Sequence, residues 1–217
     1  MQSRTVNLAR ATLKCRCHVC AFFHRRDDEY DVMLPFIKEG IEAGDRAVLI
    51  LDKHQRSERL RRLTSSGVDV GNAQGNGQLE VRLWEEAHVN GGRFDACAML
   101  TLVEDIAKAG MQCGTRITRL WVNMEPAIGN FHSARNIVEY ESGINLALSK
   151  YDMVTVCTYD PTKFSASVML DILRTHPQVI LGGILQENPF YVPPGEILGE
   201  LAGQNRRRFT ERNEDRS

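Results

Sequence analysis

The densest group of chemically reactive side chains is the segment Cys-Arg-Cys-His-Val-Cys near the N-terminus, with three thiols and one imidazole. Zinc prefers such ligands, but structural zinc sites usually combine two separated pairs, and the sequence has no second pair. On a strand, alternation places Cys15 and Cys17 on one face and His18 and Cys20 on the other. The four residues cannot close around one ion, so we expect no metal here and assign the thiols to the core.

His18 and Cys20 could also form a catalytic pair, with Cys20 as a thiol nucleophile and His18 as its base. Catalytic thiolates need an exposed, electropositive site, whereas burial in the middle of a strand raises the pKa of a thiol and leaves it inert. The same two residues also make an unusual polar pair between a sheet and its helices. We expect no thiol catalysis.

Phosphate chemistry is disfavoured by the segment 22–31, Phe-Phe-His-Arg-Arg-Asp-Asp-Glu-Tyr-Asp, which follows the first apolar run. A nucleotide-binding protein would carry a glycine-rich loop and a lysine there, and this segment has neither. The fourth run does not end in an acidic residue that could hold hydrated magnesium, although Glu125 lies just beyond it. We therefore predict that the chain is not an enzyme.

Two further candidates follow from helical and strand geometry. Glu139 and Glu141 point about 200° apart on a predicted helix, so they cannot act as a catalytic pair, and Glu141 is the one expected to face inward. Tyr159 lies at the end of a predicted strand. His176 precedes a proline, which indicates extended backbone and a role in capping the preceding helix.

Short apolar β-rich runs alternate with longer amphipathic segments along the chain. Predicted strands span 17–23, 46–52, 78–83, 116–124, 153–159 and 179–182, and predicted helices span 28–42, 57–66, 94–109, 133–150 and 162–174. Several runs are apolar on both faces, which is typical of parallel strands covered on both sides. The pattern predicts one α/β domain whose mostly parallel sheet has about six strands. In such a sheet ligands gather at the carboxyl ends of the strands.

Composition describes an ordinary globular protein of 217 residues, 42% hydrophobic and 25% charged, with a net charge of −1. This balance argues against a nucleic-acid surface over the whole molecule, and no apolar stretch reaches the roughly 18 residues of a membrane helix. Six cysteines in a chain without a secretory signal favour reduced thiols and a cytoplasmic location. Arginines are concentrated near both termini, and we expect these chain ends to be exposed to solvent.

The order and spacing of eight short motifs resemble a MEDS domain, a sensory module of DcmR-like regulators from methanogens and methylotrophs. The motifs lie within residues 17–198 and are HVCAFF, FIKEGIEAGDRAVLILD, GVDV followed by GQLEV, GGRFD, EYESGIN, VCTYD, THPQVILGG and ENPFYVPP. The resemblance implies a three-layer RecA-like (KaiC-like) fold without a phosphate loop. It also implies sensing of small hydrocarbon derivatives, with output to transcription or to a signalling partner. The chain departs from the family at 122–126, where relatives tend to carry an acidic residue and a tryptophan.

We therefore predict an N-terminal extension (1–16), a sensory domain (17–198) and a charged tail (199–217), with too few residues before the first strand for a DNA-binding domain. The predicted function is binding of a small, apolar ligand at the carboxyl edge of the sheet, with a separate regulatory protein as partner, no cofactor and no direct contact with nucleic acid or membrane. A partner-switching module without a ligand and a degenerate nucleotide-binding protein are the alternatives. The candidate ligand-binding residues are His18, Cys20, His24, Asn123, Glu125, Glu141, Cys157 and Tyr159.

Overall fold

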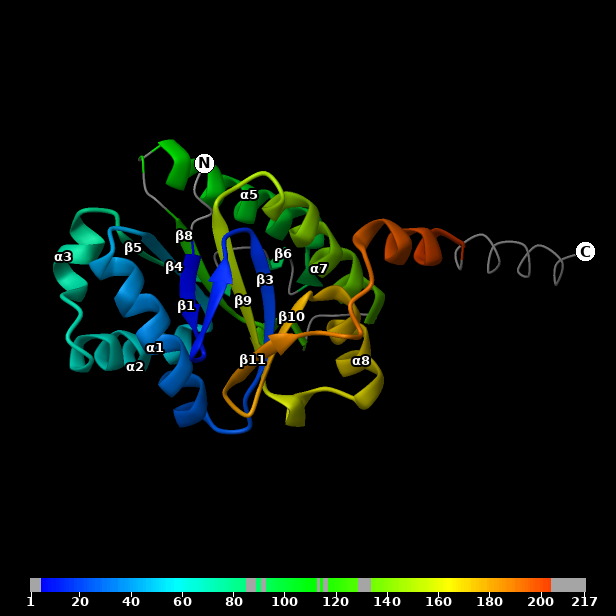
Figure 1. Ribbon diagram of the computed structural model, residues 1–217, viewed down its shortest axis with the longest axis horizontal. Coiled ribbons are helices and arrows are strands. Elements are labelled where there is room, and N and C mark those ends of the chain that lie inside the picture. The colour runs from blue at the N-terminus through cyan, green and yellow to red at the C-terminus, as the bar shows by residue number, and fades with distance from the viewer. Residues whose placement is uncertain are drawn as a thin grey trace, which may run out of the picture.

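A seven-stranded sheet forms the centre of the protein, seen here in a computed structural model that describes residues 5–84, 89, 90, 93–112, 114, 117–128 and 134–203 (Figure 1). The strand order is β11-β10-β3-β9-β8-β4-β5, and every neighbouring pair is parallel except β10 and β11. The bounds are β3 (Cys17–Phe22), β4 (Arg46–Leu51), β5 (Leu79–Leu83), β8 (Thr118–Asn123), β9 (Met153–Tyr159), β10 (Gln178–Leu181) and β11 (Ile184–Glu187). The predicted α/β class and mostly parallel sheet are confirmed.

Complete burial marks the middle strands. Every residue of β4, β8 and β9 is buried, as the doubly apolar runs predict. The seventh strand, β11, is an antiparallel edge that the sequence analysis does not contain. It returns through Gly182 and Gly183, whose positive φ angles of 57° and 74° suit a two-residue hairpin turn.

Helices cover both faces of the sheet (Figure 1). One face carries α1 (Arg26–Glu42), α2 (Lys53–Ser65) and α3 (Val70–Gly75), and the other carries α5 (Ala96–Gln112), α7 (Ala134–Leu148) and α8 (Ala166–Thr175). Short elements complete the described chain: α6 (Glu125–Ile128), the 3₁₀ turn η1 (Pro161–Lys163), the small hairpin of β6 (Val89–Asn90) and β7 (Arg93–Phe94), and helical residues 194–203. None of the described helices has the length and apolar character needed to cross a membrane.

Helix starts differ from the sequence prediction by one to four residues. The side chain of Asp95 caps α5 by accepting a hydrogen bond from the Ala98 amide at 3.0 Å. Helix α1 begins earlier, at Arg26, and its N-cap residue makes no side-chain hydrogen bond. The helix also continues through Pro35, although proline in a helix interior usually kinks or ends the helix.

An N-terminal hairpin of β1 (Thr5–Leu8) and β2 (Ala11–Lys14) packs against α1. Its apolar side chains Val6, Leu8 and Leu13 are buried in the same core as α1 and β3. Residues 5–14 are therefore part of the packed body, although the basic side chains of Arg10 and Lys14 are exposed, as expected. The charged tail predicted after residue 198 lies largely outside the described residues.

Candidate functional site

The eight candidate residues fall into two groups. Five of them lie in the core between the sheet and α7, and all five are at most 2% exposed: His18, Cys20, Glu141, Cys157 and Tyr159. The other three lie at the carboxyl edge of the sheet: His24, Asn123 and Glu125. We call the first group, together with His176, the inner cluster.

Glu141 is the centre of the inner cluster. It projects from α7, as the helical stripe predicted, toward His18 on β3 and Cys157 on β9. Its Oε2 atom lies 3.3 Å from His18 Nε2 and accepts a 3.8 Å hydrogen bond from Cys157 Sγ. His18 Nε2 is also 3.4 Å from that sulfur. Two neighbouring parallel strands and one helix thus bring an imidazole, a thiol and a carboxyl group together.

Two residues from strand ends complete the cluster. Tyr159 donates a 2.5 Å hydrogen bond from its hydroxyl to Glu141 Oε1. His176 stacks on His18 with 4.0 Å between ring centroids, and its Nε2 lies 3.5 Å from Glu141 Oε2. Its Nδ1 lies 2.8 Å from the Ile172 carbonyl oxygen, so the predicted capping role is confirmed. The contact with Glu141 escaped sequence analysis because it depends on β10 lying beside β3.

Burial controls the protonation of the inner cluster. Desolvation lowers the pKa of His18 and of His176 to about 3, so both imidazoles are neutral at neutral pH. Burial raises the pKa of the Glu141 carboxyl, against the opposing effect of His176, and raises those of the Cys157 thiol and the Tyr159 phenol well above their usual values. Both imidazoles are therefore uncharged, and burial disfavours the charged forms of the carboxyl, thiol and phenol groups around them.

The cysteine-rich segment divides as strand alternation predicts. Cys15 and Cys17 pack against the core on the α1 face, whereas Cys20 is buried on the α7 face with His18. Burial raises the pKa of the Cys17 thiol to about 12, and Cys20 Sγ donates to the Gln178 carbonyl oxygen at 3.7 Å. These cysteines and His18 do not meet around one point.

A second buried network lies on the opposite face of the sheet around Glu29 of α1. Its Oε1 atom accepts hydrogen bonds from Thr158 Oγ1 at 2.8 Å, Arg59 Nη2 at 3.0 Å and Trp121 Nε1 at 3.1 Å. The Arg59 guanidinium also lies over the Trp121 ring, 3.9 Å from its centroid. The sequence pattern does not indicate this network, because a charged residue such as Arg59 on an amphipathic helix is expected to lie at the surface.

The carboxyl-edge candidates enclose little space. Arg26 bridges this edge, because its guanidinium donates to Glu29 Oε2 at 3.1 Å and to Glu125 Oε2 at 2.8 Å. Asn123 Nδ2 donates to Glu125 Oε1 at 3.5 Å. The hollow bounded by these residues and His24 has a volume of about 30 Å³, which is enough for one water molecule. Asn123 and Glu125 therefore do not line a ligand-sized pocket.

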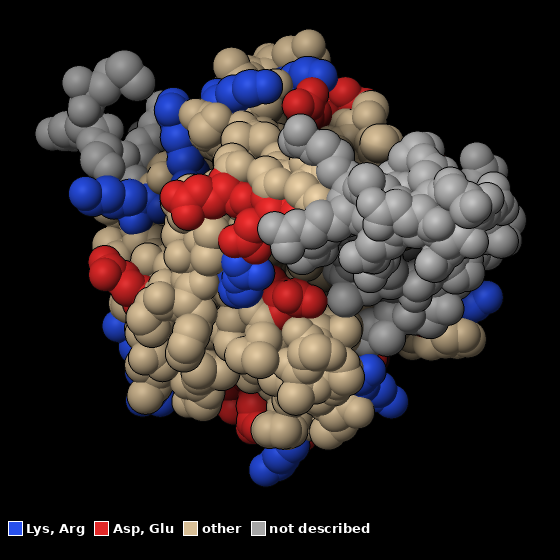
Figure 2. All heavy atoms as spheres, turned by 90° about the vertical axis from the view of Figure 1, so that its right-hand side faces the viewer, with Lys and Arg blue, Asp and Glu red and all other residues tan. Residues whose placement is uncertain are grey.

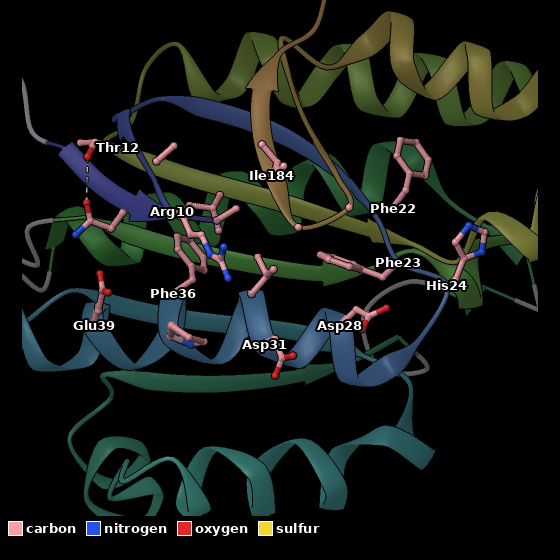
Figure 3. Close-up of a pocket in the computed structure, with 18 residues that line it drawn as sticks. Arg10, Thr12, Phe22, Phe23, His24, Asp28, Asp31, Phe36, Glu39 and Ile184 are labelled. Atoms are coloured by element: carbon pink, nitrogen blue, oxygen red, sulfur yellow. Dashed lines mark hydrogen bonds between the residues drawn. The ribbon is translucent and has the colours of Figure 1, made fainter.

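A much larger groove, of about 950 Å³, lies beside that edge (Figure 3). Its walls are the turn of the N-terminal hairpin, the carboxyl end of β3, the outer face of α1 and the turn between β10 and β11. Phe23 and Phe36 supply aromatic surface from the α1 side of the core, and polar or charged side chains surround it: Arg10, His24, Asp28, Asp31 and Glu39. We call this the hairpin groove. Of the eight candidate residues predicted from the sequence, only His24 lines this groove. The groove depends on the N-terminal hairpin, which the sequence pattern did not predict.

The connection from β3 to α1 contains no phosphate cradle. It consists of three residues, Phe23 to Arg25, and the first turn of α1 then presents Asp27, Asp28 and Glu29. Amides at a helix N-terminus attract anions, but three carboxylates in the first turn repel them.

Comparison with protein families identifies the chain at the level of a domain. The sequence profile of the family described as MEthanogen/methylotroph, DcmR Sensory domain (MEDS) matches residues 17–177. The transcriptional repressor DcmR of Methylorubrum extorquens is 27% identical over 160 residues, which are 73% of this chain and 57% of that protein. The chain thus spans little more than half the length of this curated relative.

Two solved structures with a similar fold come from archaea. A KaiC-like protein from Pyrococcus horikoshii OT3 has a TM-score of 0.58 and 18% identity, covering 77% of this chain and 72% of the other. The flagellar accessory protein FlaH from Methanocaldococcus jannaschii has a TM-score of 0.60 and 12% identity, covering 85% and 84%. At these identities the comparisons show the fold alone, and that fold is the KaiC-like arrangement expected from the sequence.

Proposed function

The chain belongs to the MEDS family of sensory domains, and from that premise we propose that it is a non-catalytic module that binds a small hydrocarbon-derived ligand in the hairpin groove. The single observation that carries the proposal is the groove itself. Its volume of about 950 Å³ lies within the usual range for small-molecule sites, and it joins aromatic surface to a few charged groups.

The charges around the groove indicate the chemistry of the ligand. Three carboxylates, from Asp28, Asp31 and Glu39, outnumber the guanidinium of Arg10. This balance disfavours phosphates and other anions and favours a neutral or cationic polar group on an apolar body. The aromatic rings of Phe23 and Phe36 would contact the apolar part.

The ligand would act as a signal because the groove joins elements that are far apart in the sequence. The hairpin turn, α1 and the turn between β10 and β11 each form a wall. A ligand touching all three would favour one arrangement of them over others. We propose that a separate regulatory protein, of transcriptional or two-component type, reads this arrangement in the cytoplasm. The similarity to a transcriptional repressor supports the regulatory part of this proposal.

The alternatives find less support. The three-residue β3–α1 connection and the acidic first turn of α1 argue against a surviving nucleotide site. Lys and Arg are scattered among acidic side chains on the described part of the face that carries α8 (Figure 2), which argues against direct nucleic-acid binding there. Partner switching without a ligand leaves the hairpin groove without a role.

A thermal-shift screen tests the proposal with short alcohols, aldehydes, halogenated alkanes and nucleotides as probes. A compound present at a hundred times its Kd adds about 2.7 kcal/mol, which raises the Tm by roughly 5–11 °C for a protein of this size. Val32 lines the groove, and its Cγ2 lies 3.9 Å from the position of a Cβ on Gly183, so Val32→Trp should fill this part of the groove and abolish the shift. Leu170→Trp, at a 56% exposed position on α8, is the matched control.

Two results would overturn the proposal. One is the absence of a shift with every apolar probe while a nucleotide raises the Tm. The other is equal binding of the same probe by Val32→Trp and Leu170→Trp, because the ligand would then occupy some other place.

A further inference from the structure

We propose that His18, Glu141, Cys157 and His176 form a binding site for a divalent transition-metal ion, with zinc as the expected occupant. One atom from each side chain converges, and these four atoms all lie within 4.8 Å of one another. They come from β3, α7, β9 and the junction between α8 and β10. This site is separate from the hairpin groove and does not depend on the function proposed for it.

Four of the six separations between the donor atoms are close to those of a tetrahedral metal site, and the other two, which join His176 Nε2 to His18 and to Cys157, are at most 4.8 Å. A zinc ion with Zn–N of about 2.0–2.1 Å and Zn–S of about 2.3 Å holds neighbouring ligand atoms about 3.3–3.6 Å apart. In the cluster, Glu141 Oε2 lies 3.3 Å from His18 Nε2 and 3.5 Å from His176 Nε2. The Cys157 sulfur lies 3.4 Å from His18 Nε2 and 3.8 Å from Glu141 Oε2. Small side-chain movements would therefore admit the ion.

The buried Nε2 atom of His176 is the most direct pointer to a ligand. The His176 side chain is fully buried, and within the described part of the chain its Nε2 makes no hydrogen bond. The Nδ1 proton goes to the Ile172 carbonyl oxygen, 2.8 Å away, which leaves a lone pair on Nε2 directed at Glu141. An uncompensated lone pair in a dry core is costly, and a metal ion would satisfy it.

Outer contacts orient the donors as they do in known metal sites. Metal-binding histidines usually donate their other ring nitrogen to a carbonyl or carboxylate, and His176 donates to Ile172 in that way. Tyr159 occupies Glu141 Oε1 with a 2.5 Å hydrogen bond and leaves Oε2 facing the other donors. Helix α8 and strand β9 thus fix both ligands before any ion arrives.

The donor set also selects the kind of ion. Two neutral imidazoles, one thiolate and one carboxylate carry two negative charges, which balance a divalent ion in the low-dielectric core. Binding would replace the Cys157 thiol proton with the ion and release that proton to solvent. Thiolate and imidazole favour zinc and its neighbours over magnesium and calcium, which take oxygen ligands.

The experiment begins with metal analysis of purified wild-type protein, which should contain close to one equivalent of zinc. The protein is then unfolded, freed of metal with a chelator and refolded with Co²⁺, because a fully buried site is expected to fill during folding. Wild type should show tetrahedral cobalt bands together with thiolate-to-cobalt charge transfer. Cys157→Ser should lose the charge-transfer band and bind Co²⁺ at least tenfold more weakly.

The matched control is Cys17→Ser, which removes a β3 thiol on the opposite face of the sheet and should bind like wild type. His176→Gln is a second test variant, since it changes the ligand number without removing a thiol. The proposal is overturned if refolded wild type binds no Co²⁺, or binds it without thiolate charge transfer. It is also overturned if Cys157→Ser and Cys17→Ser behave alike.

Discussion

Two buried glutamates lie on opposite faces of the same sheet, and β9 contacts both of them. Thr158 points toward Glu29 on the α1 face, whereas its neighbours Cys157 and Tyr159 point toward Glu141 on the α7 face. Each glutamate is at most 3% exposed. Their surroundings differ in one respect, which is the source of positive charge.

Glu29 has a permanent cation and Glu141 does not. Arg59, itself fully buried, makes an ion pair with Glu29 at 3.0 Å. Among the described residues, the ion-pair partners of Glu141 are His18 and His176, whose pKa values burial lowers to about 3. A charge in the core needs a partner. The α1 face therefore supplies its own cation, and the α7 face either stays protonated or takes a cation from outside.

The largest expected effect comes from removing each carboxylate in turn. Glu29→Gln leaves the Arg59 guanidinium buried without its counterion and should cost about 3–5 kcal/mol of unfolding free energy. Glu141→Gln in chelator-treated protein removes a carboxyl group that has no arginine partner among the described residues and should cost less than about 1 kcal/mol. Urea denaturation at neutral pH measures both. Equal losses of unfolding free energy for the two variants would contradict the proposed difference between Glu29 and Glu141.

Two close-packed glycines give a smaller contrast between the faces. A Cβ at Gly40 of α1 would lie 2.5 Å from Arg119 Cδ, and Arg119 is held by Asp45 and by the Phe36 carbonyl oxygen. A Cβ at Gly143 of α7 would lie 2.6 Å from Leu100 Cδ1, the end of a flexible side chain.

We expect Gly40→Ala to destabilise by about 1–3 kcal/mol because its neighbour cannot move. Gly143→Ala should change stability by less than about 1 kcal/mol, since the gain in helix propensity offsets the repacking. Paired denaturation curves test this ranking. A greater loss for Gly143→Ala would mean that the α7 face is the more rigid one.

The smallest effect is expected at Arg26, the other arginine near Glu29. Its side chain is 42% exposed, and it joins Glu29 to Glu125 across the carboxyl edge. Solvent and salt screen such a pair, so Arg26→Gln should cost less than about 1 kcal/mol, and the loss should shrink further in 1 M NaCl. A loss as large as that of Glu29→Gln would show that Arg26, rather than Arg59, balances the buried carboxylate.

Local patterns in the sequence reveal the central strands and the inward position of Glu141. The apolar composition of β4 and β9 is enough to predict that these strands are fully buried. The spacing of apolar residues along its helix is enough to predict that Glu141 faces inward. The hairpin of β10 and β11 also has a local sequence signal, because the pair Gly182-Gly183 is typical of a two-residue turn with positive φ angles.

Other features depend on contacts that no local pattern contains. The N-terminal hairpin turns at Ala9 and Arg10, which adopt positive φ without glycine, so its turn has no sequence signature. The hairpin groove was missed with it. The inner cluster required knowledge that β10 lies next to β3, because that pairing alone brings His176 to His18. The residue types of the site could be recognised in the sequence, but the order of the strands in the sheet, which brings them together, could not be predicted.

X-ray absorption spectroscopy at the zinc edge tests the central claim, that the α7 face takes its cation from outside, most directly. Refolded, zinc-loaded wild-type protein should show one sulfur at about 2.3 Å and three nitrogen or oxygen atoms at about 2.0–2.2 Å. Cys157→Ser should lose the sulfur shell, and Cys17→Ser should keep it. A wild-type spectrum with only nitrogen and oxygen ligands, or with two or more sulfurs, would contradict the account.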